Sequence, residues 1–536
     1  MRLSNDVLLN IFRCYLDASP RSWPRLVHIC RKWRYIVFTC QQALHLRLFC
    51  SSGTPASKTL DLWPPLPIVL EYGGSLALDP LAPEDELNII AALKRSDRVS
   101  SISLTVTTSL LDKLYAVERP FLKLEELVLL SQDSVPLTLL SAFECGPRLR
   151  RLHLTRINFP GLLRLLYSSR NLVDLCLHEA LNSCYPLEDL ADALSGMAQL
   201  QSLSLHFPST IDVFFPPTPL DRHDVLPALT QLGFRGPINC LERLMHRIDA
   251  PRLGYIQVTV TEKSGSGYNF HFPGLGKFVT DKSGSGYHLP SLGKFVNRIE
   301  MFKSPHQARI RSSEGAISIS FTQPGAPTCF KFRLFTEPLD RQLFAMAHIL
   351  PHFSTFLLNV EDLRVSVMQT SSQADSISNK QWLWLLQSFT GVKWLYLDVN
   401  DSTNIVRTLQ GMSKTTVLPL LYKLYLPHPG PRHTTLSETI MSFMTSRWRS
   451  GYPVGVEYER LYRVSELHGR GAPLYTVPLH RVLTFLKQDL FLSRSPLIMR
   501  YSAMTSFLTS FNIISMPLRN FGPFSHTYAE GGKRSY

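Results

Sequence analysis

The sequence contains no long hydrophobic run. No stretch of eighteen or more apolar residues occurs in its 536 residues, so the sequence predicts no transmembrane helix. The first residues form an amphipathic segment and not the apolar core of a signal peptide. We therefore expect a protein of the cytoplasm, the nucleus or both, with no membrane partner.

Paired cysteines are missing as well. The nine cysteines stand singly, at positions 14, 30, 40, 50, 145, 176, 184, 240 and 329. An odd number of cysteines without CxxC pairs or close histidine partners predicts free thiols in a reducing compartment. The sequence also predicts no metal site.

Catalytic motifs are absent too. The chain has no HExxH, P-loop, GxSxG or EF-hand sequence. Gly276-Lys277 suggests a phosphate loop, but His271 stands where that loop needs glycine and Phe278 where it needs Ser or Thr. We expect no cofactor and no enzymatic activity.

The composition is that of a folded protein with an excess of basic residues. Apolar residues make up 44% of the chain, charged residues 18%, and the net charge is +14. The basic residues occur in small groups, without a nucleic-acid-binding motif. This pattern favours acidic partners and argues against specific binding of nucleic acid.

Residues 1–45 have the pattern of a helical hairpin. Each half places five mostly apolar side chains at the spacing of one helical face: Val7, Leu8, Ile11, Phe12 and Tyr15, then Leu26, Ile29, Cys30, Trp33 and Val37. Ser4, Asn5 and Asp6 are plausible caps of the first helix, and Pro24 suits the first turn of the second. Two short helices cannot bury all this apolar surface between them, so the rest of the chain or a partner must cover it.

Residues 99–458 carry an irregular repeat. The pattern L-x-x-L-x-L, with related apolar residues allowed, recurs roughly every 20 to 30 residues, and helix-like segments lie between its copies. It starts at Val99, Leu124, Leu149, Leu172, Leu200, Leu229 and Leu253, and again at Val360, Val392 and Leu421. A strand followed by a helix at this spacing is typical of leucine-rich repeats, whose units stack into a solenoid with a curved parallel sheet. The usual asparagine after the strand is absent, so we expect an irregular solenoid.

The remaining segments interrupt or flank this repeat. Residues 46–98 are proline-rich, and we expect them to form a connector that packs on the first repeats. Residues 262–298 contain KSGSGY and GKFV twice, which predicts a flexible inserted loop. The alternation in 308–335 predicts two or three strands. Residues 459–536 show no repeat, and this tail either caps the solenoid or is poorly ordered.

The N-terminal segment resembles a known family. Its order L-x-x-x-V-L-L-x-I-F-x-x-Y-L, then L-x-x-I-C-x-x-W-R-x-I-V, is similar to the F-box, although Ser4 stands where that family usually has proline. Hairpin, connector and irregular repeats together resemble the F-box and leucine-rich-repeat proteins of mushroom-forming fungi. The resemblance implies an α/β fold in which an F-box hairpin precedes the solenoid.

The resemblance also implies partners. F-box hairpins bind the Skp-type adaptor of cullin-based ubiquitin ligases. The residues that it places at the adaptor interface are Leu3, Val7, Leu8, Ile11, Phe12, Leu26, Cys30 and Trp33. The alternative is an N-terminal hairpin that packs on its own domain.

Strand alternation identifies a second candidate surface. Residues two, four and six after the start of each L-x-x-L-x-L string point away from the core. The candidates for substrate binding on this face are Arg151, His153, His178, His206, Arg235, Tyr255, Trp394, Tyr396 and Tyr425.

Two groups of these candidates stand out. His178, His206 and Arg235 should lie on adjacent strands, roughly 5 Å apart. Such histidines hold protons weakly and favour an acidic ligand group; the alternative is a solvated polar face. Trp394, Tyr396 and Tyr425 are either an interface or a surface covered by the tail.

These features suggest a function without covalent chemistry. We hypothesise a substrate-recognition subunit of a cullin-RING (SCF-type) ubiquitin ligase, which binds a Skp-type adaptor through the hairpin and an unknown protein substrate through the solenoid. The alternative is a protein-interaction scaffold that never joins a ligase.

Overall fold

The computed structural model describes most of the chain up to Glu459. It covers residues 3–52, 55–72, 82–115, 120–131, 137–138, 147–180, 187–208, 223–261, 289–313, 315–323, 328–336, 339–367, 379–398, 402–410, 417–427 and 434–459. Residues 262–288 of the duplicated segment and residues 460–536 of the tail lie outside the described residues. The predictions made for them stay predictions.

The chain begins with three short helices. Helix α1 (Asn5–Ala18) starts at Ser4, whose hydroxyl accepts a hydrogen bond from the amide of Val7 (3.4 Å). The helix predicted for the second half is two helices, α2 (Trp23–Val27) and α3 (Arg31–Thr39), preceded by the 3₁₀ turn η1 (Pro20–Ser22). The prediction of one continuous helix is wrong because the backbone at Cys30 is extended (φ −158°, ψ 167°), which ends one helix and begins the next.

The apolar residues of α1 divide into two stripes. Leu8, Phe12 and Leu16 are buried, and Phe12 packs against Trp33 with ring centroids 4.8 Å apart. Val7 and Ile11 face outward. The predicted apolar face is therefore divided: the stripe of Leu8 and Phe12 is covered, and the adjacent stripe of Val7, Ile11 and Tyr15 is exposed.

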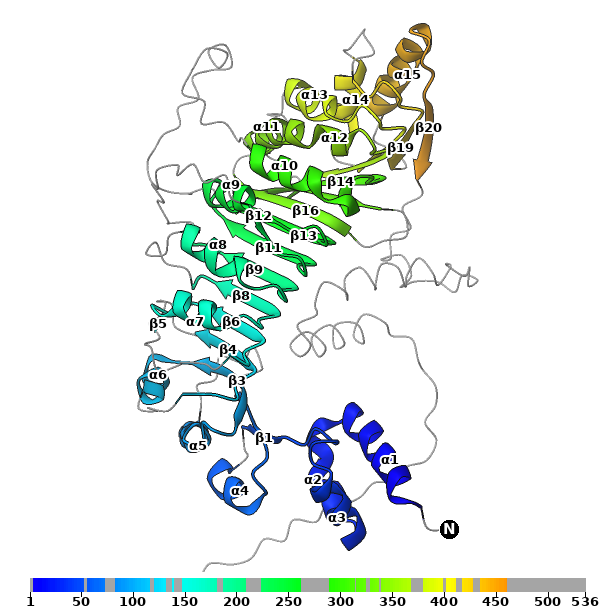
Figure 1. Cartoon of the computed structure of the whole chain (residues 1–536). Helices are drawn as coiled ribbons and strands as arrows, with labels where there is room; N and C mark the ends of the chain where they lie inside the picture. Colours follow the sequence, from blue (N-terminus) through cyan, green and yellow to red (C-terminus); the bar gives the residue numbers. More distant parts are fainter. Residues whose placement is uncertain are drawn as a thin grey trace, which may run out of the picture. The chain divides into compact units, whose positions relative to one another are not determined.

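The main body of the structure is one sheet of sixteen strands, shown in Figure 1. Its order is β1-β2-β3-β4-β6-β8-β9-β11-β13-β16-β15-β14-β17-β18-β19-β20. The strands are β1 (Leu48–Ser51), β2 (Ile68–Tyr72), β3 (Val99–Val106), β4 (Glu126–Ser131), β6 (Arg151–Thr155), β8 (Asp174–His178), β9 (Ser202–His206), β11 (Gln231–Gly236), β13 (Tyr255–Thr261), β14 (Gln307–Ser313), β15 (Ala316–Thr322), β16 (Thr328–Phe335), β17 (Asp362–Val367), β18 (Trp394–Leu397), β19 (Lys423–Pro427) and β20 (Gly455–Glu459). Two small parallel pairs accompany it: β5 (Leu137–Thr138) with β7 (Ile157–Asn158), and β10 (Asp224–Val225) with β12 (Ile248–Asp249).

The apolar strings of the repeat lead directly into these strands. Leu152 of β6 is paired in register with Leu175 of β8, Leu175 with Leu203 of β9, and Leu203 with Leu232 of β11. All four are buried. Because each repeat unit buries its leucines only against the neighbouring units, the units must stack in a row. The fold is thus the predicted α/β class with a long, mostly parallel sheet.

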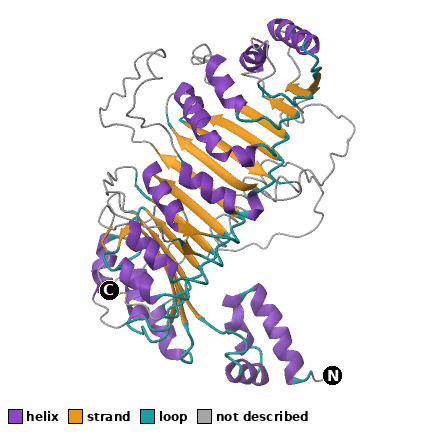
Figure 2. Ribbon diagram, turned by 45° about the horizontal axis from the view of Figure 1, so that its top comes forward, coloured by secondary structure: helices purple, strands orange, loops and turns teal. Residues whose placement is uncertain are grey.

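Helices connect the strands and cover one face of the sheet. Figures 1 and 2 show α7, α8 and α9 side by side along that face. The helices after α3 are α4 (Ala56–Leu62), α5 (Pro83–Leu93), α6 (Thr108–Tyr115), α7 (Leu162–Ser168), α8 (Leu187–Ser195), α9 (Ile238–Arg247), α10 (Pro290–Arg298), η2 (Glu300–Phe302), α11 (Leu339–Ile349), η3 (Leu350–Phe353), α12 (Ser354–Leu357), α13 (Asn379–Gln387), α14 (Ser402–Gln410) and α15 (Thr434–Arg449).

The sheet starts earlier than the repeat pattern indicates. The segment predicted as a connector supplies β1 and β2, and β2 pairs in parallel with β3. The parallel sheet therefore begins at Leu48, not at Val99. The prolines between residues 60 and 70 separate α4 from β2, in agreement with the expectation that they prevent a long helix.

The repeat is interrupted by an antiparallel meander. Strands β14, β15 and β16 follow one another as neighbours, but β16 pairs with β13 and β14 pairs with β17. After β13 the chain leaves two places in the sheet open and forms β14. It then fills those places with β15 and β16, and β17 pairs with the far edge of β14. Between β13 and β14 lies α10, whose Phe295 and Val296 are buried. The prediction of a flexible loop is wrong for residues 289–298, because these apolar side chains belong to the core.

Within the described ranges, no helix combines the length and the apolar character needed to cross a membrane.

Candidate functional site

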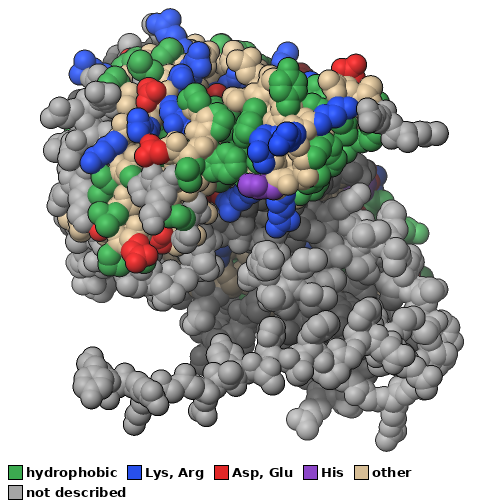
Figure 3. All heavy atoms as spheres, turned by 90° about the horizontal axis from the view of Figure 1, so that it is seen from below, with side chains coloured by type: hydrophobic (Ala, Val, Ile, Leu, Met, Phe, Trp, Pro, Cys, Tyr) green, Lys and Arg blue, Asp and Glu red, His purple; other side chains and the backbone are tan. Residues whose placement is uncertain are grey.

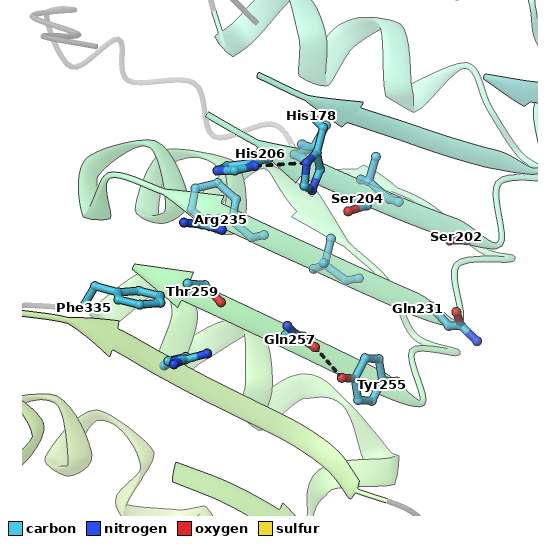
Figure 4. Close-up of a pocket in the computed structure, with 16 residues that line it drawn as sticks. His178, Ser202, Ser204, His206, Gln231, Arg235, Tyr255, Gln257, Thr259 and Phe335 are labelled. Atoms are coloured by element: carbon cyan, nitrogen blue, oxygen red, sulfur yellow. Dashed lines mark hydrogen bonds between the residues drawn. The ribbon is translucent and has the colours of Figure 1, made fainter. Parts of the chain in front are cut away.

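One row of polar side chains crosses five neighbouring strands on the face opposite the helices. His178 of β8 is the register partner of His206 of β9, and His206 is the partner of Arg235 of β11. The row continues through Thr259 of β13 to Arg333 of β16. The predicted neighbourhood of His178, His206 and Arg235 is confirmed, and Figure 4 shows the three side by side.

The two histidines are hydrogen-bonded to each other. Their Nδ1 atoms are 3.3 Å apart and their ring centroids 4.4 Å. One nitrogen must donate and the other must accept, so at least one of the two rings is neutral in this arrangement. Burial, with the charges of His178 and Arg235, lowers the pKa of His206 to about 4. Burial also lowers the pKa of His178. Both shifts favour the uncharged forms of the rings.

A hollow of about 420 Å³ opens beside this row. Small residues form its floor: Ser202, Ser204 and Gly233 lie on adjacent strands where larger side chains would fill the space. Tyr255 and Gln257 line one side and are joined by a hydrogen bond of 2.8 Å from the tyrosine hydroxyl. Burial raises the pKa of Tyr255 to about 12, so this hydroxyl keeps its proton.

Two guanidinium groups lie against the same aromatic ring at the edge of the hollow. Arg235 lies 5.5 Å and Arg333 lies 4.5 Å from the centroid of the Phe335 ring. Among the residues that the structure describes, none of those lining the hollow is acidic, and neither arginine forms an ion pair. Within the described part of the chain, neither arginine is thus neutralised by a carboxylate.

Arg333 and Phe335 were not among the residues that the sequence identified. Both lie on β16, in the alternating TCFKFRLF stretch, which the repeat pattern does not include. The alternation shows that Arg333 and Phe335 lie on the same side of a strand. It does not show that β16 lies next to β13, because the meander reverses the order of the strands.

Two other candidates on the same face lie outside the hollow and have acidic neighbours. Nε2 of His153 lies 2.9 Å from a carboxylate oxygen of Asp174, and Arg151 lies 3.5 Å from Glu126. Burial opposes the ionisation of Asp174, but the hydrogen bonds from His153 and Ser202 outweigh it and lower its pKa. Arg151 and His153 therefore already have carboxylate partners within the protein.

The remaining candidates, Trp394, Tyr396 and Tyr425, lie on strands β18 and β19. Tyr396 and Tyr425 are register partners and, with Arg364 of β17, which the sequence did not identify, form what we call the aromatic row. The two tyrosine rings are stacked, with centroids 4.3 Å apart and planes 5° apart. The guanidinium of Arg364 lies 4.6 Å from the ring centroid of Tyr396. Trp394 lies on β18 two residues before Tyr396, where His306 stacks on its ring at 6.3 Å. The row thus occupies a separate part of the sheet from the hollow.

The residues expected at an adaptor interface fall into two groups. Leu3, which precedes α1, is 50% exposed, and Val7, Ile11 and Tyr15, at 44%, 46% and 36%, form an apolar stripe along the helix. Cys30 is also exposed. The others stabilise the three helices from within: Leu8, Phe12 and Leu26 are 4%, 1% and 4% exposed, and Trp33 is half-buried against Phe12.

The opposite side of these helices contacts the following segment. The indole nitrogen of Trp23 donates to the carbonyl of Arg47 (2.7 Å), and its ring packs edge-on against Trp63 at 4.8 Å. The hairpin therefore packs in part on its own chain, as the alternative interpretation proposed, but through α2 and not through the α1 stripe. Figure 3, which views the end where Figure 1 draws α1 to α3, shows hydrophobic side chains among Lys and Arg.

Comparison with known proteins identifies no family. No family model and no curated protein matches the chain. Among solved structures, the TLR13–ssRNA13 complex has a TM-score of 0.29 and 10% sequence identity, and the match covers 77% of this chain and 49% of that chain. This chain thus spans about half the length of that neighbour. A match at this TM-score carries no argument about fold or function.

Proposed function

We propose that this protein is a substrate-recognition subunit of a cullin-RING ubiquitin ligase. Its N-terminal helices act as an F-box that binds a Skp-type adaptor, and its leucine-rich-repeat solenoid binds a protein substrate. The protein performs no covalent chemistry itself and acts by bringing the substrate close to the ligase. The F-box-like sequence of residues 3–37 suggests this role, and one structural observation supports it.

That observation is the exposed apolar stripe of α1, formed by Val7, Ile11 and Tyr15, with the exposed Leu3 just before the helix. The three helical positions are four residues apart, so their side chains follow one side of the helix. Burying such side chains on a partner is favourable by roughly 25 cal/mol per Å² of apolar surface. Because the inner stripe already holds the helices together, the outer stripe is free to bind an adaptor without unfolding the segment.

The test is co-expression with a Skp-type adaptor and a pull-down of the full-length chain. Ile11→Asp adds a charge to the exposed stripe, and Asn10→Asp adds the same charge to a neighbouring exposed position of α1. We expect the adaptor to be captured by wild type and Asn10→Asp, with at least about tenfold less captured by Ile11→Asp. Equal capture by all three, or no capture by folded wild type, would contradict the proposal.

The same pull-down separates a ligase subunit from a scaffold. A ligase subunit brings the cullin with the adaptor, whereas a scaffold that binds the adaptor alone leaves the cullin in solution. Cullin in the wild-type sample, and its loss together with the adaptor from Ile11→Asp, is the expected result. Adaptor without cullin would favour the scaffold.

A further inference from the structure

We propose that an exposed apolar stripe of α15 is a docking surface for the segment of the chain that follows β20, residues 460–468. This segment forms one further helix beside α15 and covers the end of the stacked repeats. The stripe consists of Met441, Met444 and Trp448, which follow one another at helical steps of three and four residues. The proposal concerns the last repeat and does not depend on the ligase role.

Helix α15 has one face in the core and the stripe outside it. Phe443 is 1% exposed, and the buried guanidinium of Arg447 donates to the carbonyl of Leu418 at 3.0 Å. Met441 and Trp448 are 61% and 75% exposed. The inner face thus already fixes the helix on the sheet, and the stripe is available for a second contact.

The order of the repeats indicates which segment comes next to α15. Along the chain, β17, β18 and β19 are each followed by a helix, and these helices, α13, α14 and α15, pack one beside the next (Figure 1). Strand β20 continues the series by pairing in parallel with β19. Within the described ranges, β20 is the last strand and α15 the last helix. A helix that follows β20 therefore takes the place beside α15.

The core below β20 is also incompletely covered. Leu424 of β19 is fully buried, whereas its register partner on β20, Val456, is only half-buried. Each unit of a stacked repeat is covered by its neighbours, so the last unit needs a cap with an apolar inner side. A helix beside α15 would cover both the stripe and this end of the core.

The segment after β20 has the pattern of a short amphipathic helix. It reads RLYRVSELH, in which Leu461, Val464 and Leu467 lie three residues apart on one helical face. The sequence GRGAP comes next, and its glycines and proline should end the helix. Because Arg460 directly follows β20, the effective concentration of the segment beside α15 is on the order of millimolar. This tether favours the segment over a second copy of the chain.

The experiment measures oxidation of methionines in the full-length protein by hydrogen peroxide, with each residue followed by mass spectrometry. Met441 of the stripe is compared with Met301 of η2, which is 51% exposed, and with Met346 of α11, which is fully buried. The structure shows Met441 as the more exposed of the first two. If the segment covers the stripe, Met441 should nevertheless react at least about fivefold more slowly than Met301.

Two lysine substitutions provide a matched pair of variants. Val464→Lys places a charge on the apolar face of the segment and should raise the oxidation rate of Met441 to about that of Met301. Glu466→Lys introduces the same side chain on the opposite face and should leave the rate of Met441 as in wild type. Met346 should stay slow in every protein, which shows that the variants are folded.

Three results would overturn the proposal. Equal oxidation of Met441 and Met301 in wild type would show that nothing covers the stripe. Slow oxidation of Met441 in Val464→Lys would show that a different part of the chain covers it. A wild-type dimer in light scattering, with protection of Met441 lost on dilution, would show that a second copy binds there. None of these measurements involves the adaptor, so the ligase proposal has its own test.

Discussion

The N-terminal helices and the polar face of the sheet differ in the kind of side chain that they expose to solvent. Helix α1 buries Leu8 and Phe12 and still leaves a second apolar stripe in solvent. Strands β6 to β13 bury their leucines completely and expose polar or charged residues. The difference indicates two kinds of partner, because an apolar stripe gains from burial and a cationic hollow gains from an anion.

The sheet itself shows a similar contrast. Near the aromatic row, Lys423 pairs with Glu457 at 2.5 Å and Lys393 with Glu361 at 2.7 Å, but Nε of Arg364 is buried without a hydrogen-bond partner among the described residues. The hollow has arginines without such partners among the described residues. Basic residues occur in both regions, so their number alone does not indicate a ligand site. What distinguishes the hollow is its lining, which has small residues as its floor and, among the residues that the structure describes, no acidic side chain.

The largest expected effect is the difference in stability between substitutions in the two stripes of α1. Phe12→Ala removes a buried ring from contact with Trp33 and should destabilise the three helices by about 3 to 5 kcal/mol. Ile11→Ala, one residue away, removes an exposed side chain and should change stability by less than about 0.5 kcal/mol. Hydrogen exchange of α1 and α3 in the full-length chain measures both. Similar protection in the two variants would show that the stripes are not distinct.

The next effect tests how closely the repeats pack. A Cβ added at Gly391 would lie 2.2 Å from the carbonyl oxygen of Leu358, whereas one added at Gly254 would lie 3.8 Å from that of Thr230. Both glycines lie where the chain enters a strand of the sheet. Gly391→Ala should therefore destabilise the protein by roughly 2 to 4 kcal/mol and Gly254→Ala by less than about 1 kcal/mol. Urea unfolding gives the comparison, and equal costs would contradict it.

A smaller effect concerns pH and belongs to the hollow. The folded pKa of His206 is about 4, below the ordinary value, so between pH 6.5 and 4 the unfolded chain binds a proton that the folded protein does not. Stability should therefore fall with pH in this window, by about 1 to 2 kcal/mol from this group. His206→Gln should flatten the profile in thermal unfolding at a series of pH values. A profile equally steep in the variant would show that His206 is not the group responsible.

The smallest effect concerns the aromatic row. Stacked rings such as those of Tyr396 and Tyr425 contribute about 1 kcal/mol beyond their burial. A double-mutant cycle with Tyr396→Leu and Tyr425→Leu should give a coupling energy of this size. Additive effects of the two substitutions would mean that the stacking seen in the structure adds no stability.

The sequence predicts the parts of this fold that depend on local pattern. The strings from Val99 to Leu421 lead into ten strands, and alternation along those strands correctly places His178, His206 and Arg235 side by side. Ser4 also begins the first helix as predicted. These features depend on neighbours in the chain or on a repeat, and both can be seen in a sequence.

Other features depend on contacts between distant segments. Strands β1 and β2 precede the repeat pattern. They join the sheet because β2 pairs with β3 and β1 pairs with β2, and no local signal in the sequence shows this pairing. The meander brings Arg333 next to Thr259 although β14 and β15 come first in the chain. The hollow therefore could be predicted only in part. Its histidines follow from the repeat, whereas its second arginine and its aromatic ring follow from the order of the strands.

The central claim is that the outer stripe of α1 binds a partner while the inner stripe holds the helices together. The most direct test measures adaptor capture and hydrogen exchange of α1 on the same full-length proteins. We predict that Ile11→Asp loses the adaptor and keeps the protection of α1, whereas Phe12→Ala loses the protection of α1. If Ile11→Asp keeps the adaptor, or loses the protection of α1 together with it, the account of two separate stripes is contradicted.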